Sequence, residues 1–170
     1  MTTIRYDDLV ESVAAALQYI SYYHPADYIA HLARAYEREE SPAAKDAIAQ
    51  ILTNSRMSAE GRRPICQDTG IVNVFLKIGM NVKWEGFGAH SIQEAVDEGV
   101  RRGYNNPDNK LRASVLSDPI FERKNTKDNT PAVVFMDVVP GDTVDVTVAA
   151  KGGGSENKSK VYMLNPSDNI

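Results

Sequence analysis

Residues 132–150 of this 170-residue sequence read Ala-Val-Val-Phe-Met-Asp-Val-Val-Pro-Gly-Asp-Thr-Val-Asp-Val-Thr-Val-Ala-Ala, and they indicate its fold class most clearly. Two β-rich runs, 132–139 and 143–150, are separated by Pro-Gly-Asp, a composition typical of tight turns. So short a connection joins antiparallel strands, because parallel neighbours need a crossover of roughly a dozen residues or more. We therefore expect a β-hairpin here, and a mixed sheet in place of a purely parallel one.

A further strand is expected upstream, at residues 71–79. This run, Ile-Val-Asn-Val-Phe-Leu-Lys-Ile-Gly, is rich in β-branched and aromatic residues and ends at a glycine. It follows directly on Arg63-Pro-Ile-Cys-Gln-Asp-Thr-Gly70. The single cysteine, Cys66, is therefore expected at the mouth of a strand.

Helices are predicted before and between these strands. Apolar residues recur at spacings of three and four from about 6 to 22 and again from 26 to 39. A third helix is expected to begin at Ser41, where Pro42 takes the first helical position. A fourth should begin at Ser91, which forms a capping-box pattern with Glu94, and run to about 104.

The prediction is an α+β fold with N-terminal helices packed on a mixed, largely antiparallel sheet. One domain over residues 1–170 is expected, helical over about 1–60 and mixed α/β over about 61–170. A hydrophobic content of 42% is enough for one buried core.

Composition also excludes several function classes. The formal net charge of −4 offers no basic field to a nucleic acid. No apolar run approaches the roughly 18 residues of a membrane span, and the N-terminus lacks the apolar core of a secretory signal. A single cysteine forms no internal disulfide, which favours a cytoplasmic location.

Two loops are candidates for chemistry, and the first surrounds Cys66. One thiolate alone cannot hold a structural zinc ion or an iron–sulfur cluster, because such sites take three or four ligands. Cys66 is therefore either an ordinary buried cysteine or one part of a larger site. Its neighbours Gln67, Asp68 and Thr69 suit an apolar core poorly. They form either a polar turn closed by a glycine or a polar wall around a small substrate.

The second loop is Lys151-Gly-Gly-Gly-Ser-Glu-Asn-Lys-Ser159. It follows a predicted strand and resembles a phosphate-binding loop, but Asn157 stands where the second glycine is required, and Glu156 would place a carboxylate beside the phosphates. Bare glycine backbone still allows an anion to approach closely, and the side chains that follow supply donors. The expected contacts to a dicarboxylate are Gly154, Asn157, Lys158 and Ser159.

These loops, together with Arg123-Lys-Asn-Thr-Lys-Asp-Asn129, carry a family resemblance. The chain resembles the N-terminal part of class I, iron–sulfur-dependent fumarate hydratases and the related tartrate dehydratase alpha subunits, with the motifs in the family's order. The resemblance implies a [4Fe–4S] cluster held by three cysteines. Cys66 matches the first of them, and the other two are expected beyond Ile170.

The resemblance further implies a hydro-lyase that interconverts fumarate and L-malate. It implies that Gln67 and Asp68 face the substrate and that Asp68 is catalytic, paired with a threonine outside this chain. A family arginine that clamps a substrate carboxylate aligns with Arg112, whose planar fork suits that task, while Arg101 and Arg102 remain alternatives.

None of the three histidines, His24, His31 and His90, is a candidate for the family's catalytic histidine. They are expected to face solvent or to cap helices.

The implied partners are a small dicarboxylate substrate and either the C-terminal part of the same chain or a beta subunit. A homodimer is expected when the protein is complete, since the family is usually dimeric, and the 170 residues alone are expected to be inactive.

Two alternatives stay open. One is the tartrate dehydratase alpha subunit, which these loops do not distinguish from a fumarate hydratase, and the other is a metal-free module that binds small acids.

Overall fold

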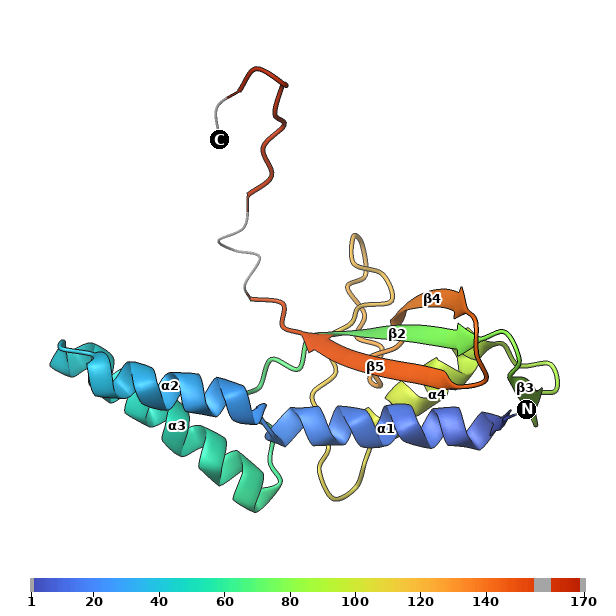
Figure 1. The fold of residues 1–170 in the computed structure, drawn as a ribbon, viewed down its shortest axis with the longest axis horizontal. Helices are drawn as coiled ribbons and strands as arrows, with labels where there is room; N and C mark the ends of the chain where they lie inside the picture. Colours follow the sequence, from blue (N-terminus) through green and yellow to red (C-terminus); the bar gives the residue numbers. More distant parts are fainter. Residues whose placement is uncertain (1, 155–159, 169–170) are drawn as a thin grey trace.

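The computed structural model describes residues 2–154 and 160–168 and has an α+β fold, as predicted (Figure 1). Among the described residues, no helix combines the length and the apolar character needed to cross a membrane. The elements in chain order are β1 (Thr3–Arg5), α1 (Tyr6–Tyr22), α2 (Ala26–Arg38), α3 (Pro42–Gly61), β2 (Ile71–Gly79), β3 (Lys83–Glu85), α4 (Ile92–Tyr104), β4 (Val133–Val139) and β5 (Val144–Lys151).

The core lies between the sheet and two helices, α1 and α4. Alternate residues of β2 point to one face, which places Val72, Val74, Leu76 and Ile78 in the interior. They pack against apolar side chains of α1 and α4: Leu9, Val10, Val13, Leu17, Ala95, Val96, Val100 and Tyr104. Each large apolar side chain buried in this way contributes about 1.5–3 kcal/mol.

A glycine lets the two helices approach closely. A Cβ atom on Gly99 of α4 would lie 2.7 Å from the backbone oxygen of Val10 and 2.7 Å from Cβ of Val13, both on α1. This approach seals the core beside β2, so α1 and α4 act as one layer on the sheet.

The prediction of a β-hairpin is wrong. β4 and β5 are not paired with each other, because β2 lies between them. The strand order is β4-β2-β5, in which β2 pairs in parallel with β4 and antiparallel with β5. The sheet is mixed, as predicted, and one of its two pairings is antiparallel. A separate parallel pair joins β1 to β3.

Gly79, the last residue of β2, explains how so short a connection crosses a strand. Residues 140–143 pass over the end of β2, and a Cβ atom on Gly79 would lie 2.6 Å from the oxygen of Gly141. The Gly79 N–H donates to the Thr143 oxygen at 2.8 Å, and the Asn81 N–H donates to the Gly141 oxygen at 2.9 Å. The turn does join strands of opposite direction, but they are next-nearest neighbours.

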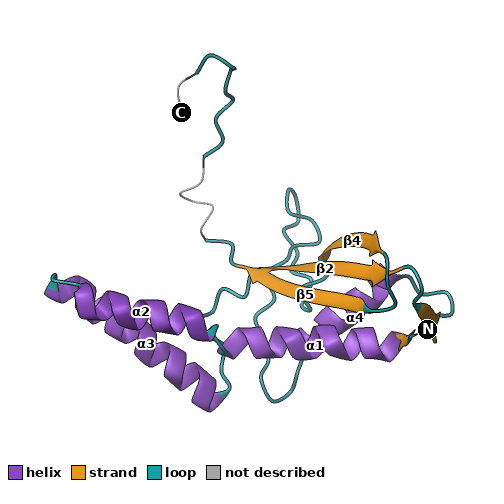
Figure 2. Cartoon of the chain, in the orientation of Figure 1, coloured by secondary structure: helices purple, strands orange, loops and turns teal. Residues whose placement is uncertain are grey.

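Only α1 of the N-terminal helices packs on the sheet. α2 and α3 pack on each other and extend beyond its edge (Figure 2). α2 has no buried residue, and Tyr28 and Tyr36 on its apolar stripe remain 40% and 37% exposed. The expected helical layer therefore consists of α1 with α4, while α2 and α3 form a projecting pair.

The other face of the sheet carries a stacked aromatic pair. Phe75 of β2 and Phe135 of β4 are directly opposed in the register, with ring centroids 4.9 Å apart and planes 8° apart. Both remain about half exposed, at 45% and 51%. The buried core is thus confined to the helical side of the sheet.

Candidate functional site

A cavity of about 250 Å³ lies where the cysteine loop meets the ends of α1, α4 and β5. This volume is below the roughly 300–1,000 Å³ of pockets that hold drug-sized ligands, so the cavity suits a small molecule. Its lining combines an apolar wall with a polar one: Leu17, Ile20, Ser21, His24, Pro64, Ile65, Cys66, Asp68, Thr69, Tyr104, Leu111 and Ala150.

The cysteine loop is fixed where it leaves α3. Arg62 caps that helix in the left-handed conformation, with φ of 47°. The Ile65 N–H donates to the Ser21 oxygen at 2.8 Å, and Asn54 Nδ2 donates to the Ile65 oxygen at 2.9 Å. These bonds hold the chain against α1 immediately before Cys66, so the thiol is placed by two helices.

Cys66 itself is exposed, and its thiol donates to the backbone oxygen of Asp68 at 3.5 Å. Its interpretation as an ordinary buried cysteine is therefore wrong. An exposed thiol is accessible to a metal or a reactant, whereas a cysteine buried in apolar surroundings is inert.

Asp68 joins the cysteine loop to the glycine loop. Its carboxylate accepts the Gly153 N–H at 3.1 and 2.9 Å and the Gly154 N–H at 3.1 Å. The N–H groups of Gly153 and Gly154 hold the pKa of Asp68 below its usual range, helped by the Gly70 N–H and the charge of Lys151. In this conformation Asp68 is an anchor for the glycine loop, and an ionised carboxylate so well supplied with donors is a weak base.

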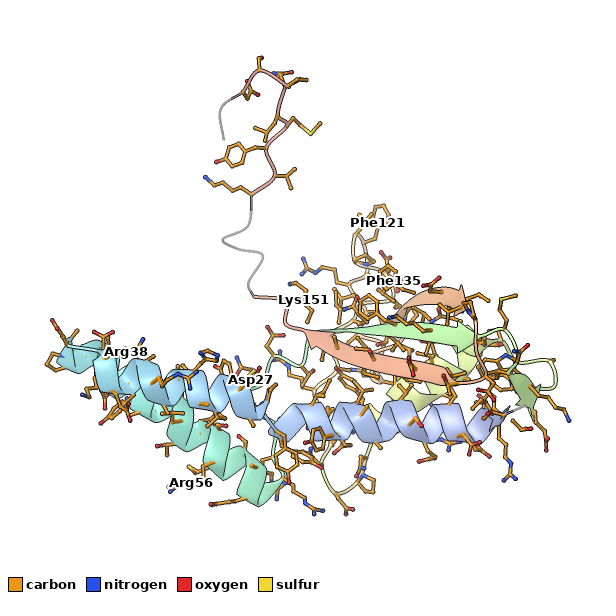
Figure 3. All side chains as sticks on the ribbon, viewed as in Figure 1. Asp27, Arg38, Arg56, Phe121, Phe135 and Lys151 are labelled. Atoms are coloured by element: carbon orange, nitrogen blue, oxygen red, sulfur yellow. The ribbon has the colours of Figure 1, made fainter. Side chains whose placement is uncertain are left out.

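Gly70 allows the two loops to meet. It has a φ of 71°, and a Cβ atom there would lie 2.0 Å from the Lys151 oxygen. Lys151 ends β5 beside Ile71, its partner in the register, at the point where the chain turns toward the glycine loop (Figure 3). A side chain at position 70 would force the loops apart.

The backbone of the cysteine loop is held from behind by buried groups. Tyr104 Oη donates to the Thr69 oxygen at 3.1 Å, and burial raises the pKa of this phenol. The Thr69 hydroxyl donates to the backbone oxygen of Arg112, and Asn129 Nδ2 donates to the Gly70 oxygen at 2.9 Å. From sequence, Asn129 was only the last residue of the 123–129 motif and Tyr104 only the end of a predicted helix, because the tertiary fold alone brings them to the cysteine loop.

The arginine alternatives are placed very differently. Arg112 is exposed, and its backbone lies against the cysteine loop through the bond from Thr69. Arg101 and Arg102 instead form ion pairs with Glu98, at 2.5 and 2.7 Å. Both charges are engaged by Glu98 of α4, and Arg102 also pairs with Glu11 of α1 at 2.5 Å. Arg112 stays the candidate that the resemblance implies.

Of the other predicted substrate contacts, some lie in the described part of the chain and some do not. Gln67 is exposed next to Cys66, and Gly154 reaches Asp68 through its N–H. Asn157, Lys158 and Ser159 lie outside the described residues.

His24 is a wall residue that the sequence analysis set aside. It lines the cavity together with Cys66, and its Nδ1 lies 3.0 Å from Ser55 Oγ on α3. Burial lowers the pKa of His24, so its ring favours the neutral form. In the sequence, His24 precedes Pro25 just after α1, a pattern that indicates a helix terminus and gives no sign of a cavity. His31 contacts Arg34 and His90 contacts Glu94, both at the surface, as expected.

The ligand set for a metal is incomplete in what the structure describes. Over residues 2–154 and 160–168, no three or more His, Cys, Asp or Glu side chains gather closely enough to hold a metal ion. The exposed thiol of Cys66, at a cavity wall beside polar groups, fits the chemistry of one thiolate ligand.

Comparison with known proteins places the chain in a family. The fumarate hydratase (fumerase) family model matches residues 10–170. The chain belongs to the fumarate hydratase family. This fumarase-family chain is 34% identical over 151 residues to a Methanocaldococcus jannaschii protein provisionally named as an L(+)-tartrate dehydratase alpha subunit.

Two further relatives come from Escherichia coli. The anaerobic class I fumarate hydratase is 34% identical over 127 residues, which are 75% of the fumarase-family chain and 22% of that enzyme. The L(+)-tartrate dehydratase alpha subunit is 29% identical over 163 residues, which are 94% of the chain and 52% of that subunit. The match to the M. jannaschii protein likewise covers 87% of the chain and 52% of the relative. The chain thus spans about half the length of the tartrate dehydratase relatives.

Proposed function

We propose that this chain is the N-terminal part of a hydro-lyase that interconverts fumarate and L-malate. One observation carries the proposal. Cys66 and Asp68 line a single small cavity, and Asp68 draws the glycine loop to its edge. The family membership supports this choice of chemistry, because relatives along most of the chain are named as fumarate hydratases.

Cys66 is proposed as one of three thiolate ligands of a [4Fe–4S] cluster, with the other two supplied from beyond residue 170. When bound, the cluster supplies a Lewis acid for the substrate's hydroxyl and carboxylate. On this chain, Leu17, Ile20 and Leu111 form the apolar wall that limits water at the site.

The polar groups are proposed to hold the substrate carboxylates. Arg112 supplies a fork of two parallel hydrogen bonds, which fixes the orientation of a carboxylate. Gln67, Asp68 and the glycine loop face the same ligand, and the loop contributes Gly154, Asn157, Lys158 and Ser159. Such fixed donors are most effective where negative charge develops in the transition state.

Asp68 is proposed to support proton transfer at the substrate. In the present conformation its carboxylate is occupied by the Gly153 and Gly154 N–H groups. Substrate carboxylate and Asp68 therefore compete for these donors, and a bound substrate frees Asp68 for proton transfer. The pKa of Asp68 is held low by those same donors, so releasing them returns it toward its usual range.

The proposed partner of this chain is a polypeptide that supplies the other half of the site. It is either the C-terminal part of the same protein or a beta subunit, and the complete protein is proposed to be a cytoplasmic homodimer. The relatives support a second half, because they are about twice as long as the matched region or longer.

L(+)-tartrate is the second candidate substrate. The observation in its favour is the share of each relative's length that the chain matches. That share is 52% for the tartrate dehydratase alpha subunit and 22% for the anaerobic fumarate hydratase. Assays of the complete, iron-loaded protein with fumarate, L-malate and L(+)-tartrate separate the two. We expect turnover of fumarate and L-malate. Turnover of L(+)-tartrate alone would assign the second function, and turnover of none of them would refute the hydro-lyase proposal.

A further inference from the structure

Asn129 is a fully buried polar residue directly behind the cysteine loop. Its side chain has no exposed surface, and its backbone has a φ of 65°. Its Oδ1 accepts the N–H groups of Ser114 and Val115, at 2.7 and 3.1 Å. Its Nδ2 donates to the Gly70 oxygen at 2.9 Å. One carboxamide therefore joins two segments that lie far apart in the sequence.

The chemistry of this position favours asparagine. A carboxamide both donates and accepts, whereas a carboxylate only accepts and a hydroxyl is too short to reach both segments from one Cβ. Asparagine also enters the left-handed region more readily than most residues. A buried group of this kind must be hydrogen-bonded to be tolerated, and Asn129 meets that requirement on both sides.

The two joined segments are the ones that carry the proposed site. Gly70 closes the loop that holds Cys66, and Ser114 follows Arg112 by two residues. Two further bonds connect the same segments. The Thr69 hydroxyl donates to the Arg112 oxygen, and Ser114 Oγ donates to the Gly70 oxygen at 3.2 Å. The Gly70 oxygen is thus held by both Asn129 and Ser114.

We propose that Asn129 is a positioning residue that sets the separation between the Cys66 loop and the segment bearing Arg112. Its importance for catalysis rests on the proposed function, whereas its effect on geometry does not. A residue that only filled the core would change stability and leave the spacing of the two segments unaltered. A positioning role and a core-filling role therefore predict different distances between the Cys66 loop and the segment bearing Arg112 once Asn129 is replaced.

The single cysteine makes that distance accessible in the chain as it is. A nitroxide label on Cys66, which is exposed, broadens the amide resonances of nearby residues in an NMR spectrum. We compare the broadening at residues 112–115 in the wild type, Asn129→Gly and Lys127→Gly. Glycine accepts the positive φ at both positions, and Lys127, with φ of 74°, is an exposed residue of the same loop. Lys127→Gly is therefore a matched control for backbone effects.

The expected result is a changed broadening profile at Ser114 and Val115 in Asn129→Gly alone, with unchanged amide resonances in the α1 and α4 core. A folded Asn129→Gly variant with the wild-type profile would overturn the proposal. Should Asn129→Gly fail to fold, Ser114→Ala removes the second bond to the Gly70 oxygen, at 3.2 Å, and must change the broadening at residues 112–115 relative to the wild type. An unchanged profile in Ser114→Ala would then count against it. The NMR measurement needs neither iron nor substrate. Its outcome therefore stands whether or not the complete protein shows hydro-lyase activity.

Discussion

Gly153 and Asp68 are 85 residues apart in the sequence, and the Gly153 N–H donates to both oxygens of the Asp68 carboxylate, at 3.1 and 2.9 Å. This contact brings the cysteine loop and the glycine loop to one place. Taken alone, the cysteine loop could be a simple polar turn, and the glycine loop an incomplete phosphate-binding loop. Joined beside a cavity that Cys66 and Asp68 line, they support the proposal that this part of the chain forms one side of a site for a small anion.

Gly70→Ala should destabilise the chain strongly. The new Cβ would lie 2.0 Å from the Lys151 oxygen, at a φ of 71° that alanine adopts with difficulty. Strain of this kind costs on the order of 1–3 kcal/mol before the clash is added. Gly88→Ala is the control, because its φ of 57° is similar but no atom lies within 4 Å of its added Cβ. Urea unfolding that gave equal losses for both variants would contradict the close approach of the two loops.

Glu98→Gln should make stability less dependent on acid pH. The hydrogen bonds and charges of Arg101 and Arg102 lower the pKa of Glu98 from its ordinary 4.5. A carboxylate with a lowered folded-state pKa stabilises the fold above its unfolded-state pKa, and this contribution is lost as pH falls through the folded-state value. The variant should therefore lose stability at neutral pH and show less further loss below about pH 4.5. Urea unfolding at several pH values tests this, with Glu37→Gln on α2 as control. Parallel curves for Glu98→Gln and wild type would show that Glu98 contributes nothing to the pH dependence of stability.

The helix positions and the location of β2 followed from local patterns, because caps and apolar spacing act over a few residues. Strand adjacency did not follow, because the Pro140-Gly-Asp142 turn dictates direction but not which strand lies between β4 and β5. That outcome depends on Gly79, whose missing side chain lets the connection cross β2. The contribution of Asn129 was equally hidden, since a buried carboxamide is recognisable only once its partners in other segments are known.

Arg112→Met should weaken substrate handling in the complete, iron-loaded protein. Loss of a charged hydrogen bond typically costs ~1.5–3 kcal/mol, and the iron content should stay normal. Arg101→Met is the control, because that side chain is paired with Glu98 on α4. An unchanged kcat/KM for Arg112→Met would show that another residue clamps the carboxylate.

The 170 residues alone should hold no stable cluster and show no hydratase activity. Cys66 is the chain's only cysteine, whereas the proposed cluster takes three thiolates. Anaerobic reconstitution followed by iron analysis measures this directly. About four irons per chain, with the absorption of a cubane cluster, would mean that the chain or a complex of its copies completes the site by itself.

Cys66 and Asp68 are proposed to have different tasks, iron binding and proton transfer, and variants of the complete, reconstituted protein separate the two. Iron content and turnover are determined side by side for Cys66→Ser and Asp68→Asn, both of which change side-chain volume little. We predict that Cys66→Ser depletes the iron. Asp68→Asn should keep the iron and lose roughly 10²–10⁴-fold in rate, the usual cost of removing a positioned acid–base group. Normal iron in Cys66→Ser, or near-normal turnover in Asp68→Asn, would contradict the account.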